Sequence, residues 1–258
     1  WPPPECSLDC EQDIIDWLLL PLPEADRELY QFIQVSKSAK QHHKSKYYSL
    51  DCSIMNIADD IAYGVHDFED AIQLKLISRE EVDTKTFHKI YESANRHEQL
   101  PPASIMLNNL FNKEIRIRKS MIGELVNFFI VSSDITMPDQ NQTFETELLK
   151  FNVNITPEAK LLLDHLKKLI YQHVIDSLEA RTIEFGGQTV LLRLFKAIQS
   201  NPKSLLDLQN REKYNKAQSE HEMARVICDY IANMSDEYAY RMHERLFGFN
   251  TRTVFERL

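Results

Sequence analysis

The chain of 258 residues is long enough to bury a substantial core, and 43% of its residues are hydrophobic. Only 5 residues are Gly, and Leu, Ile, Glu, Lys and Ala recur at helical spacing, which predicts an all-α fold with at most a short β element. The net charge of −9 argues against a surface that is basic throughout, and therefore against nonspecific nucleic-acid binding.

No apolar run approaches the roughly 18 residues that a membrane span needs, so no membrane partner is expected. The cysteines lack the paired spacing of a structural zinc site, which favours free thiols and a reducing compartment. The chain has no initiator Met and begins with the Pro-rich WPPPEC, which suggests a piece of a longer protein.

The first part of the chain is predicted to hold two short helices, over residues 8–20 and 24–36. The segment 38–49 combines basic and aromatic residues without a helical period and is expected to be a loop. Its Lys44 and Lys46 are candidates for contact with an anion, whereas the adjacent histidines of this loop form a weak set of metal ligands.

A long amphipathic helix is predicted over residues 50–77. Its apolar stripe is formed by Ile54, Ile57, Ile61, Val65, Phe68 and Ile72. The opposite face carries Asp59, Tyr63, Asp67 and Asp70, at spacings of four and three. Along the axis, Asp59 and Asp67 lie roughly 12 Å apart. A solvated surface is the common explanation of such a face, but Asp is a poor helix former and no Lys or Arg balances these acids. A metal, a partner or a substrate is therefore the alternative that we consider.

Further helices are predicted over residues 78–94, 103–111 and 113–135. In the first of them, Ser78 and Glu81 have the spacing of a capping box.

The helix predicted over 113–135 carries Arg116, Arg118 and Lys119 in its first turns. Cations are unfavourable at this positive end of the helix dipole. A bound phosphate group or the carboxylates of the central helix would compensate, and a solvated basic end is the alternative.

The C-terminal part begins with a polar, extended connection over 136–155 that leaves room for a short β element. A helix is predicted from 156 to 184, and Gly186 and Gly187 are expected to break it before the next helix. A last long helix is predicted over 218–246.

Two blocks of sequence carry a resemblance to a known family. ADDIAYGVHDFEDA, at 58–71, resembles a helix of the bacterial deoxyguanosinetriphosphate triphosphohydrolase-like family, whose HD-superfamily enzymes release inorganic triphosphate from deoxynucleoside triphosphates. RVICDYIANMSDEYAYRMHERLF, at 225–247, is similar to the late helix of that family. The resemblance implies the C-terminal portion of a multi-helix HD-type protein, with the end of the catalytic domain at 1–135 and a helical region at 136–258.

The resemblance also implies roles for the acidic face. Asp59 matches the last ligand of the family's His…His-Asp…Asp set, which holds a divalent metal such as Mg²⁺ or Mn²⁺. Tyr63 and Asp67 match residues that contact the deoxyribose and favour it over ribose. The related mammalian SAM- and HD-domain enzyme shares this spacing.

Phosphate contacts are expected from Lys44 and from Arg116 or Arg118, although the sequence does not reproduce the Arg, His, Tyr pattern of the mammalian enzyme. The resemblance further implies a dNTP substrate, with dGTP first, a cytoplasmic homo-oligomer, and a single-stranded DNA or dNTP effector.

One pair in the central helix resembles the HD dyad without occupying its place. His66 and Asp67 are adjacent, but the dyad belongs on an earlier helix, and adjacent helical residues point about 100° apart. No His followed by a His-Asp pair occurs within residues 1–50. The chain by itself is therefore expected to offer one metal ligand of four and little activity. A non-catalytic helical module for nucleotide sensing or protein interaction is the alternative function.

Overall fold

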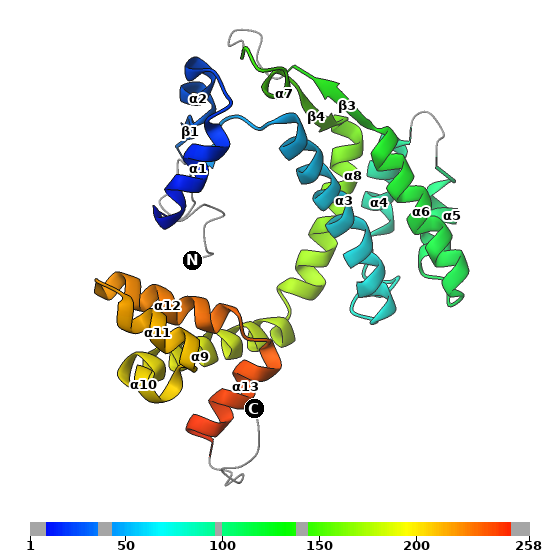
Figure 1. Cartoon of the computed structure of the whole chain (residues 1–258). Helices are drawn as coiled ribbons and strands as arrows, with labels where there is room; N and C mark the ends of the chain where they lie inside the picture. Colours follow the sequence, from blue (N-terminus) through cyan, green and yellow to red (C-terminus); the bar gives the residue numbers. More distant parts are fainter. Residues whose placement is uncertain (1–8, 36–42, 96–99, 138–143, 249–258) are drawn as a thin grey trace. The chain divides into compact units, whose positions relative to one another are not determined.

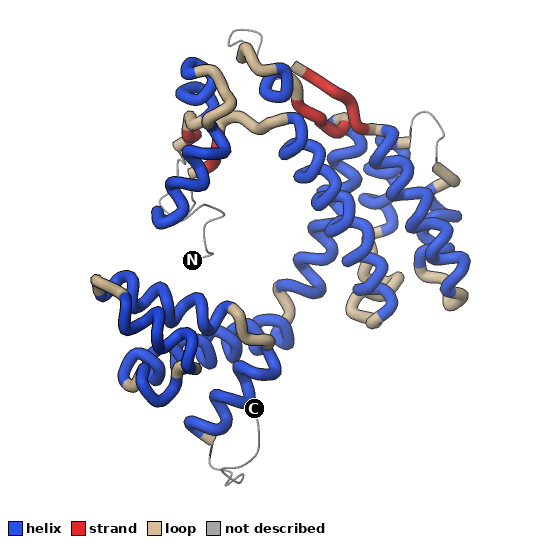
Figure 2. The backbone as a smooth tube through the Cα atoms, viewed as in Figure 1, coloured by secondary structure: helices blue, strands red, loops and turns tan. Residues whose placement is uncertain are grey.

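The computed structural model describes residues 9–35, 43–95, 100–137 and 144–248 (Figure 1). Over these residues it contains 13 α-helices and two small two-stranded sheets, and 73% of the structure is helical. The predominance of helix is evident in Figure 2, where helices are blue and strands red. The predicted all-α fold is confirmed.

The chain forms two compact units, one of residues 1–174 and one of residues 175–258. The sequence predicted that a catalytic domain ends at residue 135 and that a helical region occupies 136–258. This assignment of domains stays a prediction.

The first unit opens with short elements. They are the 3₁₀ helix η1 (Asp9–Glu11), α1 (Gln12–Leu19), α2 (Glu24–Tyr30), β1 (Ile33–Gln34) and β2 (Lys44–Ser45). The helix predicted to continue to residue 36 ends at Tyr30, because the apolar residues that follow pair as a strand, with Ile33 opposite Ser45. Residues 36–42 of the predicted loop lie outside the described part.

Asp26 of α2 is a buried carboxylate that joins distant parts of this unit. It accepts hydrogen bonds from the backbone N–H groups of Glu145 (2.9 Å) and Thr146 (2.8 Å). Burial opposes ionisation of Asp26, but the hydrogen bonds from Thr146 and Glu145 outweigh it, and the pKa of the carboxyl lies below its usual value.

The central helix α3 (Leu50–Gln73) begins where the sequence predicted it, because the Ser49 side chain accepts a hydrogen bond from the Cys52 N–H and caps the helix. It ends before the predicted residue 77. Lys75 adopts a positive φ of 60°, and the Leu76 N–H turns back to the Ala71 carbonyl at 2.8 Å, which terminates the helix.

Three helices follow α3: α4 (Thr84–Ala94), α5 (Ala103–Leu110) and α6 (Ile115–Val131). The Glu81 carboxylate accepts from the Ser78 N–H at 2.6 Å, as in a capping box, but no helix begins at Ser78. Helix α4 begins later because Asp83 caps it by accepting from the N–H groups of Lys85 and Thr86.

A β-hairpin and a long helix complete the first unit. The antiparallel strands β3 (Ser133–Thr136) and β4 (Asn152–Ile155) are separated by α7 (Glu147–Lys150), and α8 (Pro157–Ile170) follows and runs into the π-helical turn η2 (Tyr171–Ile175). The hairpin is joined to the start of α3, since the Ser53 hydroxyl accepts from the Val153 N–H at 2.9 Å.

The main core lies among five helices. Helix α3 packs on α8 and α6, α4 packs on α8 and α5, and α5 packs on α6 (Figure 1). The largest fully buried side chains are Tyr91, Phe68, Phe87, Phe129, Ile77, Met106, Leu107, Leu110, Leu125, Leu162, Leu163 and Leu166. This packing fixes which side of α3 is buried.

The second unit consists of α9 (Leu178–Ser200), α10 (Pro202–Leu205), α11 (Leu208–Lys216), α12 (Glu220–Ala232) and α13 (Asp236–Phe247). Its buried core comprises Val190, Leu194, Ile198, Leu206, Ile227, Ala239 and Met242.

Two predictions for this second unit are wrong. Gly186 and Gly187 lie inside α9, and the earlier helix is interrupted instead before Ser177, which caps α9 by accepting from the Ala180 N–H. The single last helix is divided in two, because Ser235 starts a new helix by accepting from the Tyr238 N–H.

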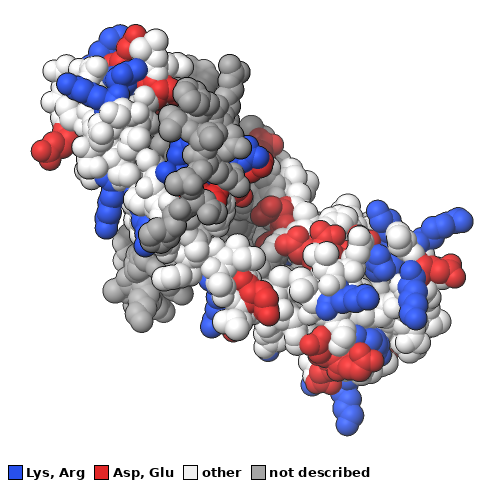
Figure 3. All heavy atoms as spheres, turned by 90° about the horizontal axis from the view of Figure 1, so that it is seen from below, with Lys and Arg blue, Asp and Glu red and all other residues white. Residues whose placement is uncertain are grey.

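The molecular surface carries charges of both signs. On the face drawn in Figure 3, Lys and Arg side chains lie beside Asp and Glu side chains. None of the helices in the described segments combines the length and the apolar composition required to cross a membrane.

Candidate functional site

The two faces of α3 differ as their sequence predicted from Ile57 onward, but Ile54, predicted to face the core, is 47% exposed in the first turns of the helix. Ile61, Val65, Phe68 and Ile72 are buried in the core. Asp59, Asp67 and Asp70 are exposed, and Tyr63 is half-buried with its ring packed against the core. The helix therefore presents carboxylates to its surroundings because the opposite stripe is anchored by apolar burial.

The three carboxylates of this face are not paired with a cation from the described part of the chain. Within the described segments, no ion pair involves Asp59, Asp67 or Asp70. The Asp67 side chain is exposed but partly desolvated by its neighbours, and this desolvation and the nearby Asp70 raise its pKa; His66 lowers the pKa, and Asp59 adds to the increase. Such a face is favourable for a ligand that brings positive charge or hydrogen-bond donors.

A basic side chain from another helix reaches α3 beside this face. Lys167 of α8 forms an ion pair with Asp60, and its Nζ lies 5.5 Å from the centre of the Tyr63 ring. The sequence analysis did not identify this contact. The two residues of the ion pair are 107 positions apart, so no local pattern could have revealed it.

Gly64 explains how α8 comes so close. A Cβ atom at this position would lie within 3.0 Å of Leu163 Cδ1 and 3.3 Å from Lys167 Cγ. The missing side chain thus allows α8 to cross α3 at the level of Tyr63.

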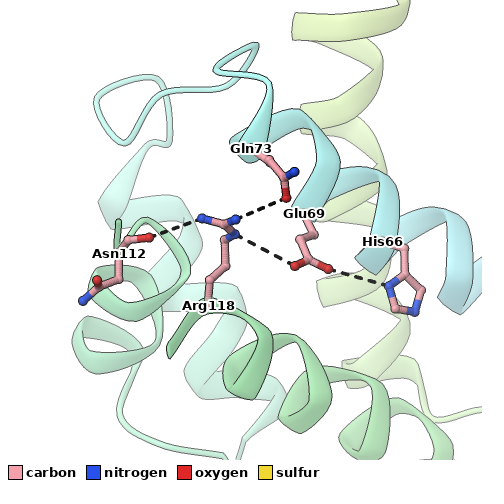
Figure 4. A network of polar contacts seen from close by, with 5 residues as sticks. All are labelled: His66, Glu69, Gln73, Asn112 and Arg118. Carbon is pink, nitrogen blue, oxygen red and sulfur yellow. Dashed lines mark hydrogen bonds and ion pairs between the residues drawn. The ribbon is translucent and has the colours of Figure 1, made fainter. Parts of the chain in front are cut away.

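A second polar network holds the C-terminal half of α3 to α6 (Figure 4). The buried Arg118 guanidinium donates to the Asn112 carbonyl and to Gln73 Oε1, both at 3.3 Å. Its Nε lies 3.9 Å from Glu69 Oε1, and Glu69 Oε2 lies 4.0 Å from His66 Nδ1. His66 therefore faces Glu69, and among the described residues neither Glu69 Oε1 nor Arg118 Nε has a hydrogen-bond partner.

The cations expected to contact phosphate lie in different surroundings. Lys44 is exposed in β2, and Arg116 is exposed in the first turn of α6. Arg118 is buried in the network of Figure 4, so a contact with phosphate would require it to leave these partners.

The donors for a divalent metal can also be assessed. Asp59 offers an exposed carboxylate of the type that Mg²⁺ and Mn²⁺ prefer. Outside the segments left undescribed, no group of three or more His, Cys, Asp or Glu side chains is arranged to hold a metal ion. The described residues therefore provide one ligand for a metal and not a complete site.

Comparison with known proteins places this geometry in context. Residues 153–245, which include α8 and Lys167, match the family described as the phosphohydrolase-associated domain. The chain is 40% identical over 251 residues to deoxyguanosinetriphosphate triphosphohydrolase-like protein 1 of Vibrio cholerae. The aligned region covers 96% of this chain and 56% of that protein. The chain is 37% identical over 253 residues to the deoxyguanosinetriphosphate triphosphohydrolase-like protein of Shewanella baltica, with the same coverage.

The chain thus spans just over half the length of these relatives. The similarity extends over nearly the whole chain, as the two sequence blocks predicted. The resemblance is confirmed: nearly the whole chain is similar to bacterial deoxyguanosinetriphosphate triphosphohydrolase-like proteins, and residues 153–245 match the phosphohydrolase-associated domain.

Proposed function

We propose that this chain supplies one wall of the nucleotide site of a metal-dependent dNTP triphosphohydrolase, which converts a dNTP and water to a deoxynucleoside and triphosphate. The observation that carries the proposal is the exposed face of α3, where Asp59 and Asp67 have no ion-pair partner in the described segments and flank Tyr63. The names of the similar proteins support a guanine deoxynucleotide as the substrate.

Each residue of this face has a proposed role. Asp59 provides one carboxylate ligand to Mg²⁺ or Mn²⁺, whose chemistry is to neutralise phosphate charge and activate water. Asp67 accepts a hydrogen bond from the sugar 3′-hydroxyl. Tyr63 packs against the sugar and disfavours a 2′-hydroxyl sterically.

Phosphate binding is proposed for exposed cations. Lys44 and Arg116 are free to move toward an anion, because both side chains are exposed. A contact between Arg118 and phosphate stays a prediction. Its buried contacts with Gln73 and Glu69 support an indirect contribution, in which it holds the half of α3 that carries Asp67.

Calorimetry of the chain with dGTP and Mn²⁺ tests the proposal. Wild type should bind, and Asp67→Asn should weaken binding about fivefold to tenfold, or about 1 to 1.4 kcal/mol, because the neutral amide oxygen is a weaker acceptor for the 3′-hydroxyl than a carboxylate. Asp51→Asn, an exposed charge change in the first turn of the same helix, is the matched control and should bind as wild type does. Equal binding by Asp67→Asn and wild type would refute the role of the acidic face.

A second candidate is a nucleotide-sensing module that binds dNTP without a metal. It is favoured by one observation, that the described segments contain no group of three metal-ligating side chains. Binding that is unchanged when Mn²⁺ is omitted, and unchanged by Asp59→Asn, would select this alternative. Measurement of triphosphate release tests the related prediction that the chain alone has little activity.

A further inference from the structure

Lys167 contacts α3 at three neighbouring positions. Its stem passes Gly64, where a Cβ atom would lie 3.3 Å from Lys167 Cγ, and its ammonium forms the ion pair with Asp60 and lies over the Tyr63 ring. The Lys167 side chain is 29% exposed and that of Asp60 is 42% exposed, so the ion pair lies partly out of water.

These contacts restrict the Tyr63 ring. The ring is half-buried against the core and also contacts the ammonium, so two different neighbours constrain its orientation. The Lys167 ammonium also forms an ion pair with Asp60, so part of its positive charge is already neutralised within the protein. A group arranged in this way is better suited to orient the ring than to bind a phosphate.

We infer that Lys167 of the phosphohydrolase-associated domain is a positioning residue, which orients Tyr63 and thereby sets the discrimination between deoxyribo- and ribonucleoside triphosphates. This inference rests on the proposed function for its consequence, the selection of the sugar. Its structural part, the control of Tyr63 by Lys167, is independent of any nucleotide.

The structural part is tested by ¹⁹F NMR of the full chain labelled with 3-fluorotyrosine. Tyr63→Phe identifies the signal of Tyr63 among the 10 tyrosines. Lys167→Met should shift this signal, whereas Lys168→Met, an exposed change on the same helix, should leave it in place. If the Tyr63 signal is the same in Lys167→Met and wild type, the inference is overturned. Asp60→Asn provides a second perturbation if Lys167→Met does not fold.

The functional part is tested by measuring the affinities for dGTP, GTP and inorganic triphosphate. Lys167→Met should lower the ratio of dGTP to GTP affinity about fivefold, which corresponds to about 1 kcal/mol. The separate variant Lys167→Arg should keep the wild-type ratio, because it keeps a cation beside the Tyr63 ring. Equal weakening for all three ligands would overturn the inference, because it would show that Lys167 contacts phosphate.

The two parts also separate this inference from the proposed function. If wild type binds no dGTP, the proposed function fails, and with it the role in sugar selection. The NMR result then still decides whether Lys167 positions Tyr63.

Discussion

Gly64→Ala tests whether the close crossing of α3 and α8 is required by the fold. The new methyl group would lie within 3.0 Å of Leu163 Cδ1, a distance that side chains do not adopt. Leu163 is buried in the main core with 2% exposure, so its side chain cannot turn out into solvent. The strain must be relieved by a rotamer change in the core or by separation of the helices.

Two opposing effects set the magnitude. Replacing Gly by Ala in a helix stabilises by about 1 kcal/mol, while an extra methyl group in a packed core costs about 1 to 3 kcal/mol. The net loss expected for Gly64→Ala is therefore about 1 kcal/mol. Gly123→Ala in α6 is the matched control, because its Cβ would meet no atom within 4 Å. This control should gain about 0.5 to 1 kcal/mol, so the two variants should differ by about 2 kcal/mol.

Urea unfolding followed by circular dichroism measures both variants. A double-mutant cycle with Leu163→Ala should show coupling, since the smaller side chain leaves room for the new methyl group. If Gly64→Ala is stabilised as much as Gly123→Ala, the argument for a required close approach is refuted.

Three further changes test the buried and exposed charges. Arg118→Met should lower the free energy of unfolding by about 3 kcal/mol, because it leaves the buried Glu69 without its cationic partner. The double variant with Glu69→Gln should recover much of this loss. Urea unfolding measures both variants, and a loss below about 0.5 kcal/mol for Arg118→Met would contradict the prediction. Asp26→Asn should cost about 1 to 3 kcal/mol at pH 7. Since the pKa of Asp26 is lowered on folding, its stabilisation is present above the unfolded pKa and is lost as pH falls through the folded pKa, so the variant and wild type should converge in acid. Partial desolvation and Asp70 raise the pKa of Asp67, so ionisation of this carboxyl opposes folding. Asp67→Asn should therefore raise Tm slightly at pH 7, but not at a pH where the carboxyl is protonated. A lower Tm of the variant at pH 7 would contradict this prediction.

The sequence by itself determined the character of the central helix. The period of its apolar residues fixed which side is buried, and Ser49 fixed where the helix begins. The same period placed Asp59, Tyr63 and Asp67 along one face, and this is the pattern that carries the resemblance to the dNTP triphosphohydrolase-like proteins. These properties are local, so they can be derived from residues within a few turns of one another.

Other boundaries depended on a competition between local signals. Ser78 and Asp83 both have the chemistry of a helix cap, and the structure uses Asp83 for α4. Gly186 and Gly187 weaken a helix by only about 1 kcal/mol each relative to Ala, and α9 continues through them while its buried side chains pack in the second core. Packing therefore decided what intrinsic preferences could not.

Only the tertiary structure decided the surroundings of the acidic face. Lys167 reaches Asp60 and Tyr63, and Arg118 reaches Glu69, because α8 and α6 pack against α3 over long separations in sequence. No local period encodes which helix lies beside which face, since that choice depends on how all the apolar stripes fit together. The sequence thus determined which carboxylates α3 presents, and the packing of α8 and α6 determined which of its acids are paired with a cation.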